Sequence, residues 1–194
     1  KVVSELSSKY SLDGIHYDYI RYHSLSYGYN KAGISIFNEK NYYYLEEDFN
    51  RIFSDYKRRS ITEFVKNAYI EIKNNLPSCI ISAAVKPNIY NAKLTFFQEW
   101  DLWLSAGYLD WAVPMNYAVN NNDFVQNMYM IKDNIPKKYH DDIIVGVAAY
   151  NQSARSLGKK IDRLRKMDFN NISIFSYNTI IENPYYWRRL KKYF

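Results

Sequence analysis

The stretch DGIHYDYIRY, residues 13–22, combines the pattern of a buried strand with polar groups that could carry chemistry. Side chains alternate along a strand, so His16 and Asp18 share one face while Ile15 and Tyr17 share the other. If Ile15 packs against a layer of helices, His16 and Asp18 point to the opposite side. Asp18 is then expected near the carboxyl end of the strand, where parallel α/β enzymes keep their catalytic groups.

Four more β-like runs follow this one. They are CIISAAV (79–85), WAVPMNY (111–117), IIVGVAAY (143–150) and ISIFSYN (172–178). Runs 79–85 and 143–150 are almost continuously apolar, as expected for parallel strands that are buried on both faces.

Segments with helical periodicity separate these runs. They cover residues 58–75, 94–108 (with Gly107 as the expected stop), 124–135 and 156–167. Strands that alternate with helices predict right-handed βαβ units and adjacent parallel strands in sequence order. No linker or repeat interrupts residues 1–194, so we expect one domain.

A long aromatic segment, residues 23–55, follows the first run. Its place after a strand predicts a loop at the mouth of the fold, packed as a lid or as the wall of a binding site.

The length of the chain restricts the fold further. An eight-stranded (β/α) barrel needs about 250 residues, and this chain has 194. We therefore expect a portion of such a barrel, with about five parallel strands. Five strands cannot close a barrel, so an upstream segment or another chain would have to supply the missing strands, and the chain alone would fold poorly.

Composition and charge leave alternatives open. The 21 tyrosines suit sugar binding, because a ring face packs on a pyranose, but they also suit an AT-rich genome. The net charge of +6 is concentrated in residues 159–166 and 187–193, which are expected to be exposed helix faces. Such a surface also favours an anionic polymer, whereas the absence of a nucleic-acid-binding motif argues against DNA or RNA.

Several classes of site are not predicted. The three histidines lack metal-ligand spacing, and neither a phosphate-binding glycine loop nor a GxSxG motif occurs. We therefore expect no metal and no cofactor. No segment is apolar enough to span a membrane, and the single cysteine, Cys79, is expected in the core.

The stretch 13–22 resembles the DGIH-x-DYIRYP signature of the glycosyl-hydrolase-like 10 family of bacterial envelope proteins. The similarity continues through RRSITEFV, FFQEWDLWLSAGYLDWAVPMNY, IIVGVAAYNQ and ISIFSYN, and so covers essentially the whole chain. Three departures are His23 in place of proline, Tyr56-Lys57 in place of a tryptophan, and Glu99 in place of aspartate. About three early strands of the family have no counterpart here, so the resemblance implies the C-terminal portion of a (β/α)8 barrel. It also implies a protein in the cell envelope or outside the cell that acts on a bacterial cell-wall (peptidoglycan-type) glycan.

Related barrels suggest roles for this strand. In α-amylase-like barrels the second aspartate of a similar strand is the nucleophile, and the matching residue here is Asp18. In chitinase-like barrels the strand ends in a glutamate that acts as the catalytic acid. The matching residue here is Ile20, so a chitinase-type mechanism would lack its acid.

A glycosidase needs two carboxyl groups, one of them protonated. We predict Asp18 as one and Glu99 as the other. Glu99 could instead be an ordinary acidic residue at a helix N-terminus, but Gln98 and Trp100 beside it favour a sugar subsite. Asp110 is expected at the opposite end of its strand and is not assigned a role.

Further side chains are predicted to contact substrate because they lie near strand ends. They are His16, Arg21, Tyr22, Gln98, Trp100, Met115, Asn116, Tyr117, Tyr150, Asn151 and Tyr177. Arg21 could orient Asp18 or bind a carboxylate. We expect Asp18, Glu99, Asn116 and Tyr150 to line one concave surface. The predicted function is polysaccharide hydrolysis, and the alternative is a carbohydrate-binding barrel without catalysis.

Overall fold

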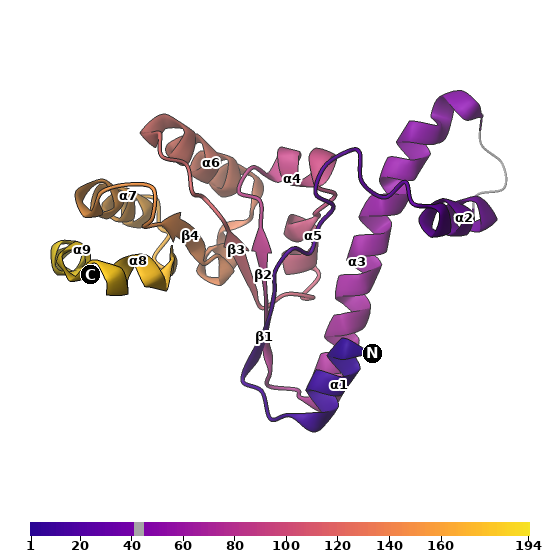
Figure 1. The fold of residues 1–194 in the computed structure, drawn as a ribbon, viewed down its shortest axis with the longest axis horizontal. Coiled ribbons are helices and arrows are strands. Elements are labelled where there is room, and N and C mark those ends of the chain that lie inside the picture. The colour runs from indigo at the N-terminus through magenta and orange to yellow at the C-terminus, as the bar shows by residue number, and fades with distance from the viewer. Residues whose placement is uncertain (41–44) are drawn as a thin grey trace. The chain divides into compact units, whose positions relative to one another are not determined.

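Helices and parallel strands alternate along the chain (Figure 1). The computed structural model describes residues 1–40 and 45–194. These residues form two compact units. Unit 1 comprises Lys1–Ala83 and Ile89–Leu109, and unit 2 comprises Ala84–Asn88 and Asp110–Phe194. The prediction of a single domain stays a prediction.

Unit 1 is built on a parallel strand pair and a long helix. Strand β1 (Gly14–Tyr17) pairs with β2 (Ile80–Val85) in a register that runs from Gly14 opposite Ile80 to Tyr17 opposite Ala83. Helix α3 (Phe49–Asn75) buries a stripe consisting of Phe53, Lys57, Ile61, Val65, Ala68 and Ile72. The Tyr17 ring meets Phe64 of this helix at 6.3 Å. The predicted alternation is therefore confirmed for His16 and Tyr17, with Tyr17 on the side of the helix and His16 exposed, whereas Asp18 lies just beyond the end of the strand.

The prediction of one long loop over residues 23–55 is wrong for most of its length. Helix α2 (Lys31–Lys40), the 3-10 turn η1 (Glu46–Asp48) and the start of α3 lie within it. Aromatic packing explains the helices, because Phe37 of α2 meets Phe49 and Phe53 of α3 at 5.7 and 5.0 Å. Residues 41–44 of the predicted loop lie outside the described residues.

The helix predicted over residues 94–108 is two helices, α4 (Ile89–Thr95) and α5 (Trp100–Ser105). Phe97 interrupts them with a left-handed φ of 56° and a fully buried ring. The carbonyl of Phe96 accepts a hydrogen bond from Tyr22 N at 3.1 Å, so tertiary contacts outweigh the helical pattern here. Gly107, with φ of 72°, ends α5 as predicted.

Helix α1 (Val2–Lys9) completes unit 1. It lies along α3 (Figure 1), where Asn75 Nδ2 donates to Ser7 Oγ at 3.0 Å. This bond accounts for the burial of Ser7, a polar residue.

Unit 2 contains the end of β2 and three further strands, β3 (Trp111–Pro114), β4 (Val145–Ala148) and β5 (Ile172–Phe175). Met115 N donates to Val85 O at 2.9 Å. Parallel bridges join Ala112 to Ile143 and Met115 to Gly146, and β4 pairs with β5 in parallel. All five predicted strands are present, although each is shorter than its apolar run, and every strand pair within the units is parallel.

Five helical segments alternate with these strands or follow them. They are α6 (Asn121–Asn134), η2 (Lys137–Asp142), α7 (Ala154–Lys166), α8 (Tyr177–Glu182) and α9 (Pro184–Leu190), followed by the last turn η3 (Lys191–Tyr193). Asn120 and Ser153 cap the N-termini of α6 and α7 through their side-chain oxygens. One correction concerns Lys160, which lies in the run predicted to be exposed but is 2% exposed. None of the described helices is long and apolar enough to cross a membrane.

Candidate active site

Asp18 is the first residue after β1 and its side chain is exposed. Its Oδ1 accepts a hydrogen bond from Tyr19 N at 2.8 Å, and Tyr19 takes a left-handed φ of 54°. Positive φ at a tyrosine is uncommon and marks a sharp local turn. Among the described residues no cation, Arg21 included, forms an ion pair with Asp18.

His16 lies on the face of β1 opposite Tyr17 and is exposed. Its Nδ1 is 2.8 Å from Ser82 Oγ on β2, which fixes the ring across the strand pair. Burial, and to a lesser extent the charge of Cys79, raise the pKa of Tyr17 to about 12. The Tyr17 hydroxyl therefore stays protonated, and His16 and Asp18 are the groups of this strand that face solvent.

Arg21 stands over the Tyr19 ring, with 4.6 Å from its guanidinium carbon to the ring centre. Its Nη1 is buried and has no hydrogen-bond partner among the described residues. A pocket of about 270 Å³ lies here between residues 19–22 and the Ser60, Ile61 and Phe64 side chains of α3. A guanidinium with a free buried donor beside a pocket can donate a hydrogen bond to a carboxylate or a sugar oxygen.

Tyr22 and Gln98 hold this segment in place. Gln98 is 1% exposed and donates through Nε2 to Ile20 O at 3.1 Å. The Tyr22 ring packs edge-on against Phe97 at 5.4 Å. Burial, and then the charge of Tyr56, raise the pKa of Tyr22. In this structure both side chains support the turn that carries Asp18.

Lys57 is a residue of this site that the sequence prediction missed. It is 1% exposed, and its Nζ donates to Leu25 O and Tyr27 O at 3.2 and 3.3 Å. Four aromatic rings surround the ammonium group, with Phe97 nearest at 4.1 Å. Burial lowers the pKa of Lys57. Its place on the buried stripe of α3 was the pattern that could have identified it.

Glu99 lies at the N-cap of α5 with a largely buried side chain, 15% exposed. Its Oε1 is 3.7 Å from Arg58 Nε and 3.6 Å from Lys93 Nζ. Thr62 Oγ1 donates to Oε2 at 3.2 Å. Three donors therefore surround the carboxylate and tie α5 to α3. Trp100, beside it, is fully buried.

Three aromatic rings gather at the carboxyl ends of the strands of unit 2. Tyr117 stacks on Phe175 at 5.6 Å and 11°, and Tyr150 meets both rings edge-on at 6.2 and 6.0 Å. Tyr150 and Phe175 are about half exposed. Tyr177, the first residue of α8, is 72% exposed. We call Tyr117, Tyr150 and Phe175 the aromatic cluster.

The polar residues near this cluster are largely engaged within the fold. Asn116 is 1% exposed, and it donates to Phe124 O at 2.9 Å and accepts from Asn127 at 3.0 Å. Asn151 Nδ2 donates to Tyr117 O at 3.0 Å, whereas its Oδ1 is buried without a partner among the described residues. Met115 is bonded through its backbone, as described above. Substrate contacts by these residues stay predictions.

A second buried lysine, Lys160, fixes the loops after β3 and β4. Its Nζ donates to Ala118 O at 2.5 Å, to Val119 O at 3.0 Å and to Gln152 Oε1 at 2.8 Å. Burial lowers its pKa. Since Ala118 follows Tyr117 directly, Lys160 holds the backbone that carries part of the aromatic cluster.

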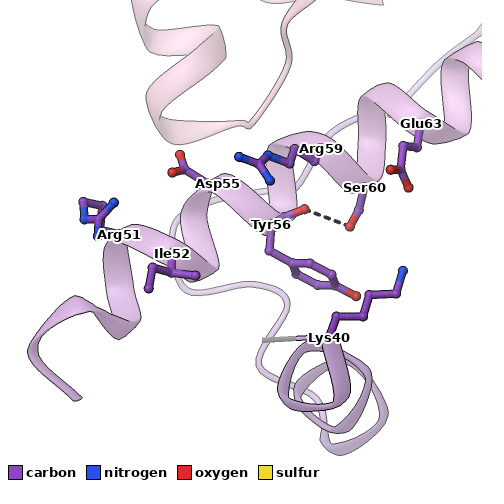
Figure 2. Close-up of a pocket in the computed structure, with 8 residues that line it drawn as sticks. All are labelled: Lys40, Arg51, Ile52, Asp55, Tyr56, Arg59, Ser60 and Glu63. Carbon is purple, nitrogen blue, oxygen red and sulfur yellow. Dashed lines mark hydrogen bonds between the residues drawn. The ribbon is translucent and has the colours of Figure 1, made fainter. Parts of the chain in front are cut away.

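A cavity of about 480 Å³ lies between α2 and α3, and none of the predicted site residues lines it. The Lys40 side chain of α2 and the Tyr56 ring of α3 extend toward each other across it (Figure 2). Its lining mixes cations such as Arg51 and Arg59 with Asp55 and Glu63. In the described part of the chain no group of three or more His, Cys, Asp or Glu side chains is placed to hold a metal ion.

Comparisons with known proteins agree with this architecture. The model of the family described as Glycosyl hydrolase-like 10 matches residues 1–172. Among solved structures, the PgaB (BpsB) glycoside hydrolase domain from Bordetella bronchiseptica superposes with a TM-score of 0.74 at 12% sequence identity. The match covers 96% of this chain and 58% of that domain, so the chain corresponds to somewhat more than half of its structural neighbour. No curated protein sequence matches the chain.

Proposed function

The chain belongs to the glycosyl hydrolase-like 10 family, and from that premise we propose that it hydrolyses glycosidic bonds in a polysaccharide, with Asp18 at the reacting centre. The observation that carries the proposal is the exposed position of the Asp18 carboxylate at the end of β1. This carboxylate is exposed at the carboxyl end of a parallel strand and lacks an ion pair among the described residues. A catalytic carboxylate must be open to substrate, and barrel enzymes place theirs at the carboxyl ends of the strands.

The second carboxyl group is proposed to be Glu99. Its neighbours Arg58 and Thr62 of α3 and Lys93 of α4 are all donors, so they hold the carboxylate in a fixed position. A two-carboxylate mechanism needs one ionised group and one that protonates the leaving oxygen. The resemblance to α-amylase-like barrels assigns Asp18 as the nucleophile, and Glu99 is proposed as its partner.

The substrate is proposed to be a bacterial cell-wall (peptidoglycan-type) glycan, met in the cell envelope or outside the cell. This part of the proposal rests on the family. The aromatic cluster supports a sugar ligand, because exposed Tyr and Phe rings at strand ends can pack against the apolar face of a pyranose.

The test of Asp18 is the substitution Asp18→Asn. We expect kcat on a cell-wall glycan to fall by about 10²–10⁴-fold, the usual contribution of a positioned acid or base, while glycan binding is retained. The matched control is Asp13→Asn, an exposed aspartate just before the other end of the same strand. If both variants keep wild-type kcat, Asp18 is not the catalytic group.

Glu99 needs a test that separates catalysis from structure. Glu99→Gln keeps the shape of the side chain and removes its charge. If Glu99 reacts, kcat falls by at least about 10²-fold in a protein that still folds. If Glu99 only joins α5 to α3, the melting temperature falls and kcat of the folded protein stays within a few-fold of wild type.

The second candidate function is carbohydrate binding without hydrolysis, and the aromatic cluster is the observation that favours it. A binding protein needs the rings and no reactive carboxylate. Tyr150→Ala would then abolish glycan binding, while Asp18→Asn would change nothing measurable.

A further inference from the structure

Helix α7 carries a continuous row of exposed cations. Arg155, Lys159, Arg163 and Lys166 are all exposed, and their spacing of four, four and three residues places them on one face of the helix. At 1.5 Å per residue this row is about 16 Å long. We call these four residues the cationic row.

The cationic row lies beside a groove. Lys159, Arg163 and Lys166 line a depression of about 360 Å³, whose other wall is formed by Asn121 and Val125 of α6. Asp162 is the acidic residue in this lining, and it forms no ion pair with a cation in the described part of the chain. Buried Lys160 adds a further positive charge beneath the groove.

The four cations are not neutralised internally. None of them forms an ion pair or a side-chain hydrogen bond with any residue that the structure describes, in contrast to Arg165 of the same helix, which donates to Tyr193 O. Four unpaired like charges along one helix repel each other and cost stability. A ligand with repeating negative charges would relieve that repulsion.

We propose that the cationic row and its groove bind a linear polymer with repeating phosphate groups that lacks nucleobases. This site is separate from the hydrolysis proposed above and does not depend on it. Arginine and lysine together are the usual phosphate-binding pair, the first through paired donors and the second as a point charge.

Two other anionic partners fit the surface less well. Single-stranded nucleic acid binds through exposed aromatic rings that stack on bases, whereas Phe124, which lines the groove, is buried. An anionic membrane is bound by helices that also insert large apolar side chains. The exposed large apolar residues of the described chain include none from α7.

The test measures binding of poly(glycerol phosphate) to the full-length protein between 50 and 200 mM salt, about the range in which phosphate contacts dominate. We expect Arg163→Gln/Lys166→Gln to weaken binding by about tenfold or more and to reduce the slope of log K against log [salt] by roughly 1–2. The matched control, Lys137→Gln/Lys138→Gln, removes the same charge from two exposed lysines of η2 and should change affinity less than about twofold.

Three outcomes would overturn the proposal. The first is an equal loss of affinity in both double variants, which would show that the polymer is attracted only by the net charge of the protein. The second is no binding of poly(glycerol phosphate) by the wild type. The third is tighter binding of oligo(dT) or of phosphatidylglycerol vesicles through the same two residues, which would assign the row to nucleic acid or to a membrane. Inorganic phosphate should compete only weakly, because it offers a single group to the row.

Discussion

Each unit buries one lysine, Lys57 among four aromatic rings and Lys160 beside the ring of Phe124, and both lysines bond loops near the strand ends. Lys57 bonds the carbonyls of Leu25 and Tyr27, and Lys160 bonds those of Ala118 and Val119. A buried ammonium is tolerated only when its donors are satisfied. These lysines therefore hold loops that would otherwise leave their carbonyl groups without protein partners.

Replacing Lys57 tests how much its hydrogen bonds to the loop contribute to stability. We expect Lys57→Met to lower the free energy of unfolding by about 2 kcal/mol, because two carbonyls lose their donor while the methionine still fills the aromatic space. For a chain of this size that corresponds to a melting temperature about 4–8 °C lower. Lys66→Met, an exposed lysine of the same helix, is the control and should shift it by less than about 2 °C.

The stability that Lys57 contributes is also expected to depend on pH. Burial lowers the pKa of Lys57 in the folded state, so between that pKa and the unfolded value of 10.5 the unfolded chain binds more protons. Stability contributed by this site therefore rises as pH rises through that window. The wild type should gain stability relative to Lys57→Met as the pH approaches 10.5, and equal pH profiles in urea denaturation would contradict this role.

At the scale of residues, sequence patterns identified some positions and missed others for physical reasons. Alternation in β1 placed Tyr17 toward the helix and His16 away from it, because period two is local. The same reasoning could not find the partners of Glu99, since Arg58 and Thr62 come from a helix about forty residues earlier in the chain.

At the scale of helices and strands, the packing of η3 on α7 depends on one glycine, Gly158. A Cβ at Gly158 would run into the Tyr193 ring, so only glycine lets the last turn of the chain approach α7. Arg165 of α7 also donates to Tyr193 O. The C-terminal turn is thus attached to α7 by a close ring contact and a charge-assisted hydrogen bond.

A double-mutant cycle tests this contact. Gly158→Ala should destabilise the protein by about 1–3 kcal/mol through overpacking, even though alanine favours helix. In a Tyr193→Ala background the same change should become neutral or stabilising by up to about 1 kcal/mol. Additive effects in thermal unfolding would show that the Tyr193 ring does not occupy this position.

Element types were predictable and element boundaries were less so. The five apolar runs all contain strands, because continuous apolar runs mark buried parallel strands. The break between α4 and α5 was not predicted, because the buried ring of Phe97 and its contacts with Lys57 and Tyr22 depend on the tertiary fold. The helix α2 was missed because its packing against α3 is equally non-local.

At the scale of the whole molecule, the chain shares a fold with a solved protein from which its sequence differs at most positions. A TM-score of 0.74 at 12% identity means that the arrangement of strands and helices is shared with a glycoside hydrolase domain while most side chains differ. Alternation of strands and helices was readable from the sequence because apolar periodicity survives such divergence. The chemistry of this chain must therefore be tested on its own residues, Asp18 first.

The most direct measurement is the release of new reducing ends from purified cell-wall glycan by the full-length protein. The proposed function predicts release that grows linearly with protein concentration and falls by about 10²-fold or more in Asp18→Asn but not in Asp13→Asn. Glycan binding without any release of reducing ends, or release that Asp18→Asn leaves unchanged, would contradict it.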